Sequence, residues 1–179
     1  SNMGSAFKDL GKLDQSIELY KKAITLKPNY AEAYCNMGNA LKDLDKSQEA
    51  IEAYQKAISL KPDHAAAYSN LGLCLHDEEK FDEAIESYNK AISLKPDYVQ
   101  AFNNLGVLYK DNEKYEDAIK MFMKAKELQP DHQNSYYNLA LIKKEQGLYE
   151  EAIEFLLKVF DLNPKHSEAN YLSWLIYSR

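Results

Sequence analysis

The chain has 179 residues, of which 45% are hydrophobic and 28% are charged, a balance typical of a folded protein rather than a disordered one. Its formal net charge of -6 argues against a nucleic-acid partner, because such binding depends first on Lys and Arg that neutralise phosphates. No stretch approaches the roughly 20 apolar residues that span a bilayer and no signal peptide begins the chain, so we expect no membrane association.

The prolines reveal an internal repeat, because all five are spaced by 34 residues. They are Pro28, Pro62, Pro96, Pro130 and Pro164. Units that end two residues after each proline give a partial repeat 1–30, complete repeats 31–64, 65–98, 99–132 and 133–166, and a partial repeat or terminal helix 167–179. We expect residues 1–179 to form a single array, and positions are counted below from the first residue of each 34-residue unit.

Each unit predicts two helices in turn. In the unit 65–98, apolar and small side chains within residues 68–75 follow the i, i+3, i+4, i+7 spacing of an amphipathic helix, which we name helix A. After a polar break, residues 81–92 repeat this spacing and predict a second helix, helix B. The proline at position 32 ends helix B, and we expect the aspartate after it to cap the next helix A. These aspartates are Asp63, Asp97 and Asp131.

Small residues recur where two helices must approach closely. Position 8 is glycine in Gly4, Gly38, Gly72 and Gly106 and alanine in Ala140. Alanine recurs at positions 20 and 27, and an aromatic residue occupies position 24 in most units. Three residues depart from their columns, namely Ser47 at position 17, Lys143 at position 11 and Leu156 at position 24. We expect these departures to weaken individual seams between helices.

With Leu or Met at position 7 and Pro at position 32, this pattern resembles the tetratricopeptide repeat over essentially the whole chain. The resemblance implies an all-α fold, a right-handed α-solenoid of antiparallel helical hairpins. It also implies that helices A line a concave groove and that helices B lie on the convex outside. Such arrays usually act as non-catalytic scaffolds for protein binding.

The groove side of helix A carries a column of asparagines. Position 6 is asparagine in the first partial repeat and in every complete repeat, as Asn2, Asn36, Asn70, Asn104 and Asn138. The neighbouring positions vary, and two of them add further amides, Asn103 at position 5 and Asn39 at position 9. Because an asparagine amide both donates and accepts, it can pair with a peptide N–H and C=O together. We therefore predict that these side chains bind an extended peptide.

The asparagine column resembles that of the tetratricopeptide region of O-linked N-acetylglucosamine transferases. In that family a ladder of asparagines lines the groove and holds target polypeptides in extended form. One alternative is that each asparagine only braces a neighbouring helix or turn. Two further alternatives are a self-associating structural scaffold and the substrate-recruiting segment of a larger enzyme such as a glycosyltransferase.

Position 13 is acidic throughout and adds Asp43, Asp77 and Asp111 to the candidate groove residues. These carboxylates either steer a ligand or form a solvated edge, where exposed ion pairs contribute about 0 to 1 kcal/mol each.

No close His pair, HExxH motif or glycine-rich phosphate loop occurs, so we expect no enzyme activity, no metal and no cofactor. We expect the histidines at position 34 to be solvated. These are His64, His132 and His166.

The two cysteines form no CxxC motif, so a reducing, cytoplasmic location is expected.

In the last partial unit, 167–179, the terminal helix A is rich in aromatic and aliphatic residues and has no helix B after it. Trp174 stands at position 8, where other units have Gly or Ala, so standard packing is not expected there. We predict homo-oligomer formation through this helix. The residues concerned are Tyr171, Leu172, Trp174, Leu175 and Tyr177.

Overall fold

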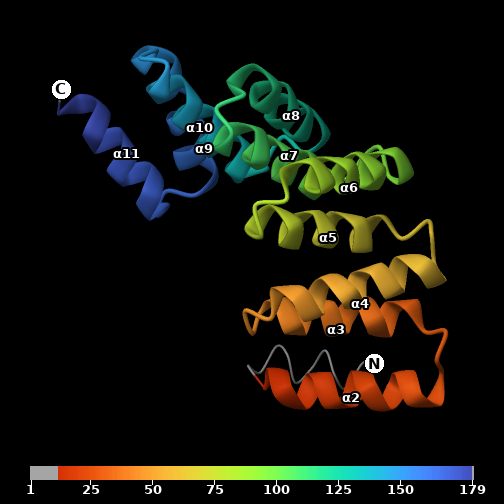
Figure 1. The fold of residues 1–179 in the computed structure, drawn as a ribbon. Coiled ribbons are helices and arrows are strands. Elements are labelled where there is room, and N and C mark those ends of the chain that lie inside the picture. The colour runs from red at the N-terminus through yellow and green to blue at the C-terminus, as the bar shows by residue number, and fades with distance from the viewer. Residues whose placement is uncertain (1–11, 179) are drawn as a thin grey trace. The chain divides into compact units, whose positions relative to one another are not determined.

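The computed structural model describes residues 12–178, which form helices and turns without a strand in that range (Figure 1). The helices B are α2 (Leu13–Leu26), α4 (Ser47–Leu60), α6 (Phe81–Leu94), α8 (Tyr115–Leu128) and α10 (Tyr149–Leu162). The helices A are α3 (Ala31–Lys42), α5 (Ala65–Asp77), α7 (Val99–Asp111), α9 (Gln133–Glu145) and α11 (Ser167–Tyr177). The all-α class and the helical hairpins predicted from the repeat are confirmed.

The described helices fall into two compact units, which divide after Pro96. In unit 1, α3 pairs with α4 and α5 pairs with α6, and each helix B also contacts the helix A that follows it within the unit. In unit 2, α7 pairs with α8 and α9 pairs with α10, and α11 contacts both α9 and α10. Successive helices A also contact each other directly within each unit, α3 with α5 and α9 with both α7 and α11. The single array over residues 1–179 stays a prediction.

The glycine at position 8 makes room for the aromatic ring at position 24 of its own repeat. A Cβ atom added to Gly38 would lie 2.7 Å from the Tyr54 ring, and one added to Gly72 would lie 2.9 Å from the ring of Tyr88. Such distances are shorter than van der Waals contact, so a larger residue than glycine would force the ring to shift. The repeat 133–166 has alanine at position 8 and the smaller Leu156 at position 24, both in one core cluster.

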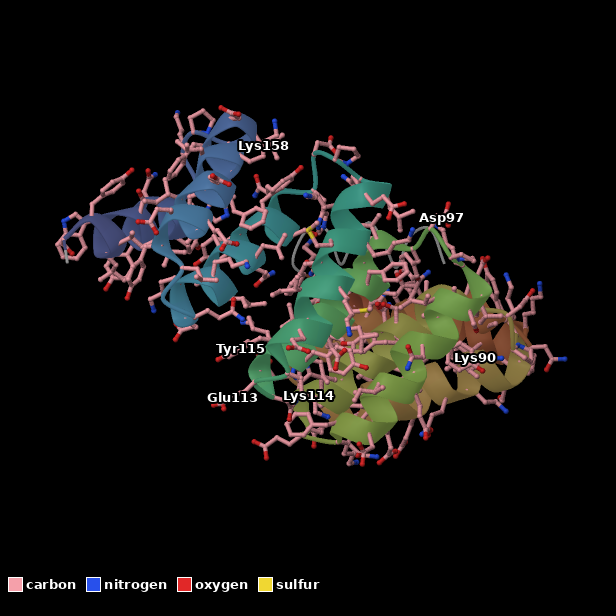
Figure 2. All side chains as sticks on the ribbon, turned by 90° about the horizontal axis from the view of Figure 1, so that it is seen from above. Lys90, Asp97, Glu113, Lys114, Tyr115 and Lys158 are labelled. Atoms are coloured by element: carbon pink, nitrogen blue, oxygen red, sulfur yellow. The ribbon has the colours of Figure 1, made fainter. Side chains whose placement is uncertain are left out.

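The turn from helix A to helix B uses a left-handed backbone conformation at position 15. Asp45, Glu79 and Glu113 have φ values of 57°, 58° and 58°, and Gly147 has a φ of 76°. Figure 2 shows Glu113 at the turn that joins α7 to α8. This region disfavours side chains other than glycine, so three of these turns carry backbone strain that the turn at Gly147 avoids.

The prediction that the aspartates at position 33 cap the helices A is wrong. The N-cap lies one residue later, at position 34, because each helix A begins at the first residue of its unit and the aspartate stays in the turn. His64 and His166 accept a hydrogen bond from the amides of Ala67 and Ala169, respectively. The prediction that the position 34 histidines are solvated is also wrong, since all three are partly buried at helix starts.

Candidate functional site

A hollow of about 270 Å³ lies between the helices A of unit 1. Its walls are side chains of α3, α5 and the turn before α5. They are Glu32, Cys35, Asn36, Asn39, Lys61, His64, Ala66 and Asn70. These residues include positions 2, 6 and 9 of α3, which the sequence places opposite the seam with helix B. The structure therefore brings three of the predicted asparagines of unit 1 into one hollow.

Asn39 is the centre of a hydrogen-bond network in this hollow. Its Oδ1 atom accepts from the hydroxyl of Tyr54 at 2.7 Å and from Nδ2 of Asn70 at 2.8 Å. Tyr54 is fully buried, so the network links α3 and α5 to the buried side of α4. For Asn70 the bracing alternative is therefore realised in part, through its donor end.

The same network leaves part of each amide available. Within residues 12–178, Nδ2 of Asn39, Oδ1 of Asn70 and the whole amide of Asn36 make no hydrogen bond. These three side chains are partly exposed. The hollow consequently presents both donors and acceptors to whatever occupies it, which is the chemistry that peptide backbone requires.

In unit 2 the position 6 asparagines are arranged differently. Asn138 donates from Nδ2 to the carbonyl of Asn134 in its own helix at 3.0 Å, and Asn104 makes no side-chain hydrogen bond to another described residue. Oδ1 of Asn103 is buried without a partner among the described residues. Asn2 lies outside the described residues. The asparagines of unit 2 thus provide no counterpart to the Asn39 network.

The acidic column at position 13 lies away from the unit 1 hollow. Asp43, Asp77 and Asp111 are all exposed, and none of them lines the hollow. The Asp111 carboxylate lies 3.0 Å from the Lys110 ammonium, a partly exposed pair between adjacent residues. The structure does not bring these carboxylates together with the asparagines.

A second hollow, of about 390 Å³, lies in unit 2 between α9 and α11. Tyr137 and Leu141 on one side and Tyr171, Leu172 and Leu175 on the other make it largely apolar. Polar residues, among them Lys144 and Glu168, also line it. Tyr137 and Leu141 were not predicted as site residues. The sequence signal that could have identified them is their place at positions 5 and 9 of the repeat, the positions that Cys35 and Asn39 hold in unit 1.

Helix α11 has one buried face and one exposed aromatic face. Tyr171, Trp174 and Tyr177 are 63%, 61% and 71% exposed, and the rings of Tyr171 and Trp174 are stacked at 6.1 Å between centroids. Leu172 is only 3% exposed because it packs in the core cluster with α9 and α10. Among the residues predicted for self-association, Leu172 therefore lies in the interior of unit 2, at the wall of the hollow.

The thiols are poorly suited to nucleophilic chemistry. Cys35 and Cys74 are free and buried, and burial raises the pKa of each to about 11. In the part of the chain that the structure describes, no three His, Cys, Asp or Glu residues gather as a metal site. Within residues 12–178, no helix combines the length and the apolar character that crossing a bilayer requires.

Family models match almost the entire chain. The model of the TPR repeat matches residues 4–45, and two models of the tetratricopeptide repeat match residues 35–99 and 97–165. The chain belongs to the tetratricopeptide repeat family. The helix pairs and the glycine and aromatic columns described above are the structural form of that repeat. No match to a curated protein sequence was found.

Solved tetratricopeptide-type structures resemble this repeat protein closely. MamA is 27% identical, with a TM-score of 0.79 and coverage of 92% of this chain and 96% of MamA. PilF of Pseudomonas aeruginosa is 20% identical, with a TM-score of 0.89 over 99% of this chain and 81% of PilF. YrrB, described as a TPR protein with an unusual peptide-binding site, is 22% identical, with a TM-score of 0.73 over 99% and 90%.

Proposed function

We propose that this tetratricopeptide repeat protein binds an extended peptide segment of a partner protein along its helices A. The observation that carries the proposal is the unit 1 hollow, where Asn36, Asn39 and Asn70 keep donors and acceptors available after bracing. Tetratricopeptide repeat proteins mediate protein interactions, and YrrB is described as having a peptide-binding site. Both facts support a binding role.

The spacing of the helices suits an extended ligand. Packed helices lie about 8 to 10 Å apart, and an extended chain advances about 3.3 Å per residue, so the position 6 amides of neighbouring helices A meet a peptide about every third residue. Nδ2 of Asn39 would donate to a peptide carbonyl, and Oδ1 of Asn70 would accept from a peptide N–H. Because backbone groups occur in every peptide, these contacts hold the ligand without reading its sequence.

The hollow between α9 and α11 would supply side-chain selectivity. Its apolar walls and polar surroundings are typical of sites that enclose an apolar group and orient it with a few polar contacts. We propose that unit 2 receives an apolar side chain of the partner there. Tyr137 and Tyr171 are the residues that would contact it on opposite walls.

The role that we propose is non-catalytic. The asparagine amides of the unit 1 hollow, to which we assign the contacts with the peptide, hold a polypeptide but neither attack it nor transfer protons to it. Cys35 also lines this hollow, and burial raises its pKa to about 11, which keeps it a thiol at neutral pH.

Peptide selection tests the proposal. A displayed library of random peptides about 12 residues long, enough to span roughly 40 Å when extended, is selected on the wild-type chain. The affinity of the selected peptides is then measured by fluorescence anisotropy for the wild type and for Asn36→Ala/Asn70→Ala. We expect a loss of about tenfold or more from the removal of two amides.

The matched control for this experiment is Asn89→Ala, because Asn89 is an exposed asparagine of α6 that does not line the hollow. It should leave the affinity unchanged. Equal affinity of the wild type and Asn36→Ala/Asn70→Ala, with both folded, would show that the asparagines are structural only and would defeat the proposal.

A second candidate function is self-association through α11. The exposed aromatic face of Tyr171, Trp174 and Tyr177 favours it, because large aromatic side chains gathered on one surface commonly mark protein contacts. In this function the partner would be another copy of the chain.

A further inference from the structure

His64 belongs both to the start of α5 and to the wall of the unit 1 hollow. Its Nδ1 atom accepts from the backbone amide of Ala67 at 3.4 Å, and the same amide also donates to the carbonyl of His64 at 3.0 Å. Only a neutral imidazole has an acceptor at Nδ1 in this position. The helix that carries Asn70 therefore begins at a residue whose capping role depends on its protonation state.

The surroundings of His64 disfavour its charged form on balance. Burial lowers the pKa of His64 from 6.5, and the Lys61 ammonium lowers it further. Glu32 on α3 and Asp63 in the turn act in the opposite direction, as does a hydrogen bond to backbone. The wall of the hollow beside it also carries the neutral amides of Asn36 and Asn70 and the thiol of Cys35.

Protonation would change the start of α5 in two ways. A proton on Nδ1 converts the acceptor into a donor that faces the N–H of Ala67, so the capping contact is lost. It also places a positive charge at a helix N-terminus, where the helix dipole already favours negative charge. Both effects loosen the first turn of α5, and that turn adjoins Ala66 in the wall of the hollow.

We propose that protonation of His64 weakens partner binding in the unit 1 hollow at mildly acidic pH, a regulation that rests on the proposed function. The direction of this pH effect follows from the linkage between proton binding and stability. Because the folded protein holds the pKa of His64 below 6.5, the unfolded or loosened state binds the proton more tightly. The capped state is fully stable above pH 6.5 and loses stability as the pH falls from there through the folded pKa.

The other histidines at position 34 give an internal contrast. His132 resembles His64, since burial lowers its pKa and its Nδ1 lies 2.8 Å from the hydroxyl of Ser135. His166 also accepts from a backbone amide, but its Nδ1 lies 3.1 Å from the carboxylate of Glu168. His166 belongs to unit 2 and does not line the unit 1 hollow, so it serves as a control for the role of His64.

The experiment measures the affinity of a selected peptide at pH 7.5 and 5.5, using one that lacks His, Asp and Glu. The comparison is the ratio of the two affinities within each variant. For the wild type we expect about a fivefold or greater loss at pH 5.5, which corresponds to one capping contact. His64→Asn keeps a cap that does not titrate and should bring the ratio close to one. The matched control His166→Asn should keep the wild-type ratio.

An NMR titration of the full chain adds a readout that needs no peptide. We expect the protection factor of the Ala67 amide to fall in step with protonation of the His64 ring, and to be independent of pH in His64→Asn. An equal affinity ratio in the wild type and His64→Asn would overturn the inference. If instead no peptide binds, or Asn36→Ala/Asn70→Ala binds normally, it is the proposed function that fails.

Discussion

The ring of Phe122 lies against Gly106 so closely that a Cβ atom on this glycine would be 2.7 Å from the ring. Gly106→Ala should therefore destabilise the protein by about 1 to 3 kcal/mol through overpacking, although alanine favours the helix. Phe122→Leu removes the ring that causes the clash. The double variant reproduces the pair Ala140 and Leu156, so we expect it to recover about 1 kcal/mol or more of the summed single losses.

Urea unfolding of the wild type, the two single variants and the double variant measures this coupling. Phe122→Leu alone should also be destabilised, because it leaves a cavity in the core. Additive effects of the two substitutions would show that the ring and the glycine are independent, against the geometry.

The left-handed turns predict a gain in stability. Replacing Glu79 or Glu113 with glycine should stabilise the chain by up to about 1 kcal/mol each, because relief of backbone strain exceeds the added entropy of the unfolded chain. The reverse change, Gly147→Ala, should cost about 1 kcal/mol. Thermal unfolding measures all three. Destabilisation by the glycine substitutions would mean that these glutamates contribute contacts that outweigh the strain.

Tyr54 and Tyr88 occupy the same repeat position but differ in hydrogen bonding. The hydroxyl of Tyr54 donates to Asn39, at position 9 of its repeat. In the repeat of Tyr88, position 9 is Leu73, and the buried hydroxyl of Tyr88 has no partner within the described residues. Tyr54→Phe should cost about 1 kcal/mol, and Tyr88→Phe should be neutral or stabilising, since an unsatisfied buried hydroxyl costs about 1 to 3 kcal/mol. Chemical unfolding compares them, and equal losses would contradict the assignment.

Peptide affinity should depend only weakly on salt. Backbone amides carry no net charge, so a rise from about 50 to 500 mM NaCl, which shortens the Debye length severalfold, should change the affinity by less than about threefold. Asp77→Asn should have no effect, because Asp77 is exposed and away from the hollow. Isothermal titration at several salt concentrations is the measurement. A steep dependence, or loss of binding on amidation of the peptide's C-terminus, would indicate a charge clamp.

Self-association through α11 predicts a concentration-dependent mass. Light scattering should show the wild type forming oligomers at high concentration, with a blue shift of Trp174 emission, while Trp174→Ser/Tyr177→Ser stays monomeric. Leu157→Ser is the control, since Leu157 is 58% exposed on α10 of the same unit. A wild type that remains monomeric with water-like Trp174 emission would refute this function.

The fold was predictable because the repeat supplies several independent columns that agree with one hairpin geometry. The proline spacing gives the period, and the small residues at positions 8 and 20 specify where helices touch. The start of helix A was predicted one residue too early, since Asp63 has good capping chemistry and the turn geometry that selects His64 is not visible in composition. Similarly, the sequence shows that Lys143 departs from its column but not that its ammonium lies 2.7 Å from the carboxylate of Glu151, because this ion pair depends on how α9 and α10 pack.

The candidate site was predictable only as a surface. Periodicity places Asn36 and Asn70 on one side of helix A, but it does not show that the Nδ2 of Asn70 donates a hydrogen bond to Asn39. The difference between Asn70 and Asn138, which bonds within its own helix, depends on position 9 of the preceding repeat. There Asn39 offers an acceptor to Asn70, whereas Asn138 follows a repeat with Val107.

The pairing of positions 8 and 24 sets where this chain tolerates rearrangement. Both members belong to one repeat, so duplication, deletion or transplantation of a complete unit keeps every glycine with its own ring. A crossover at the turn between helix A and helix B would instead join the first half of the repeat 133–166 to the second half of the repeat 99–132. Ala140 would then face Phe122, a pair that the 2.7 Å spacing at Gly106 shows to be overpacked. Recombination between repeats should therefore keep stability at the proline turns and lose stability at the turns that contain Glu113 and Gly147.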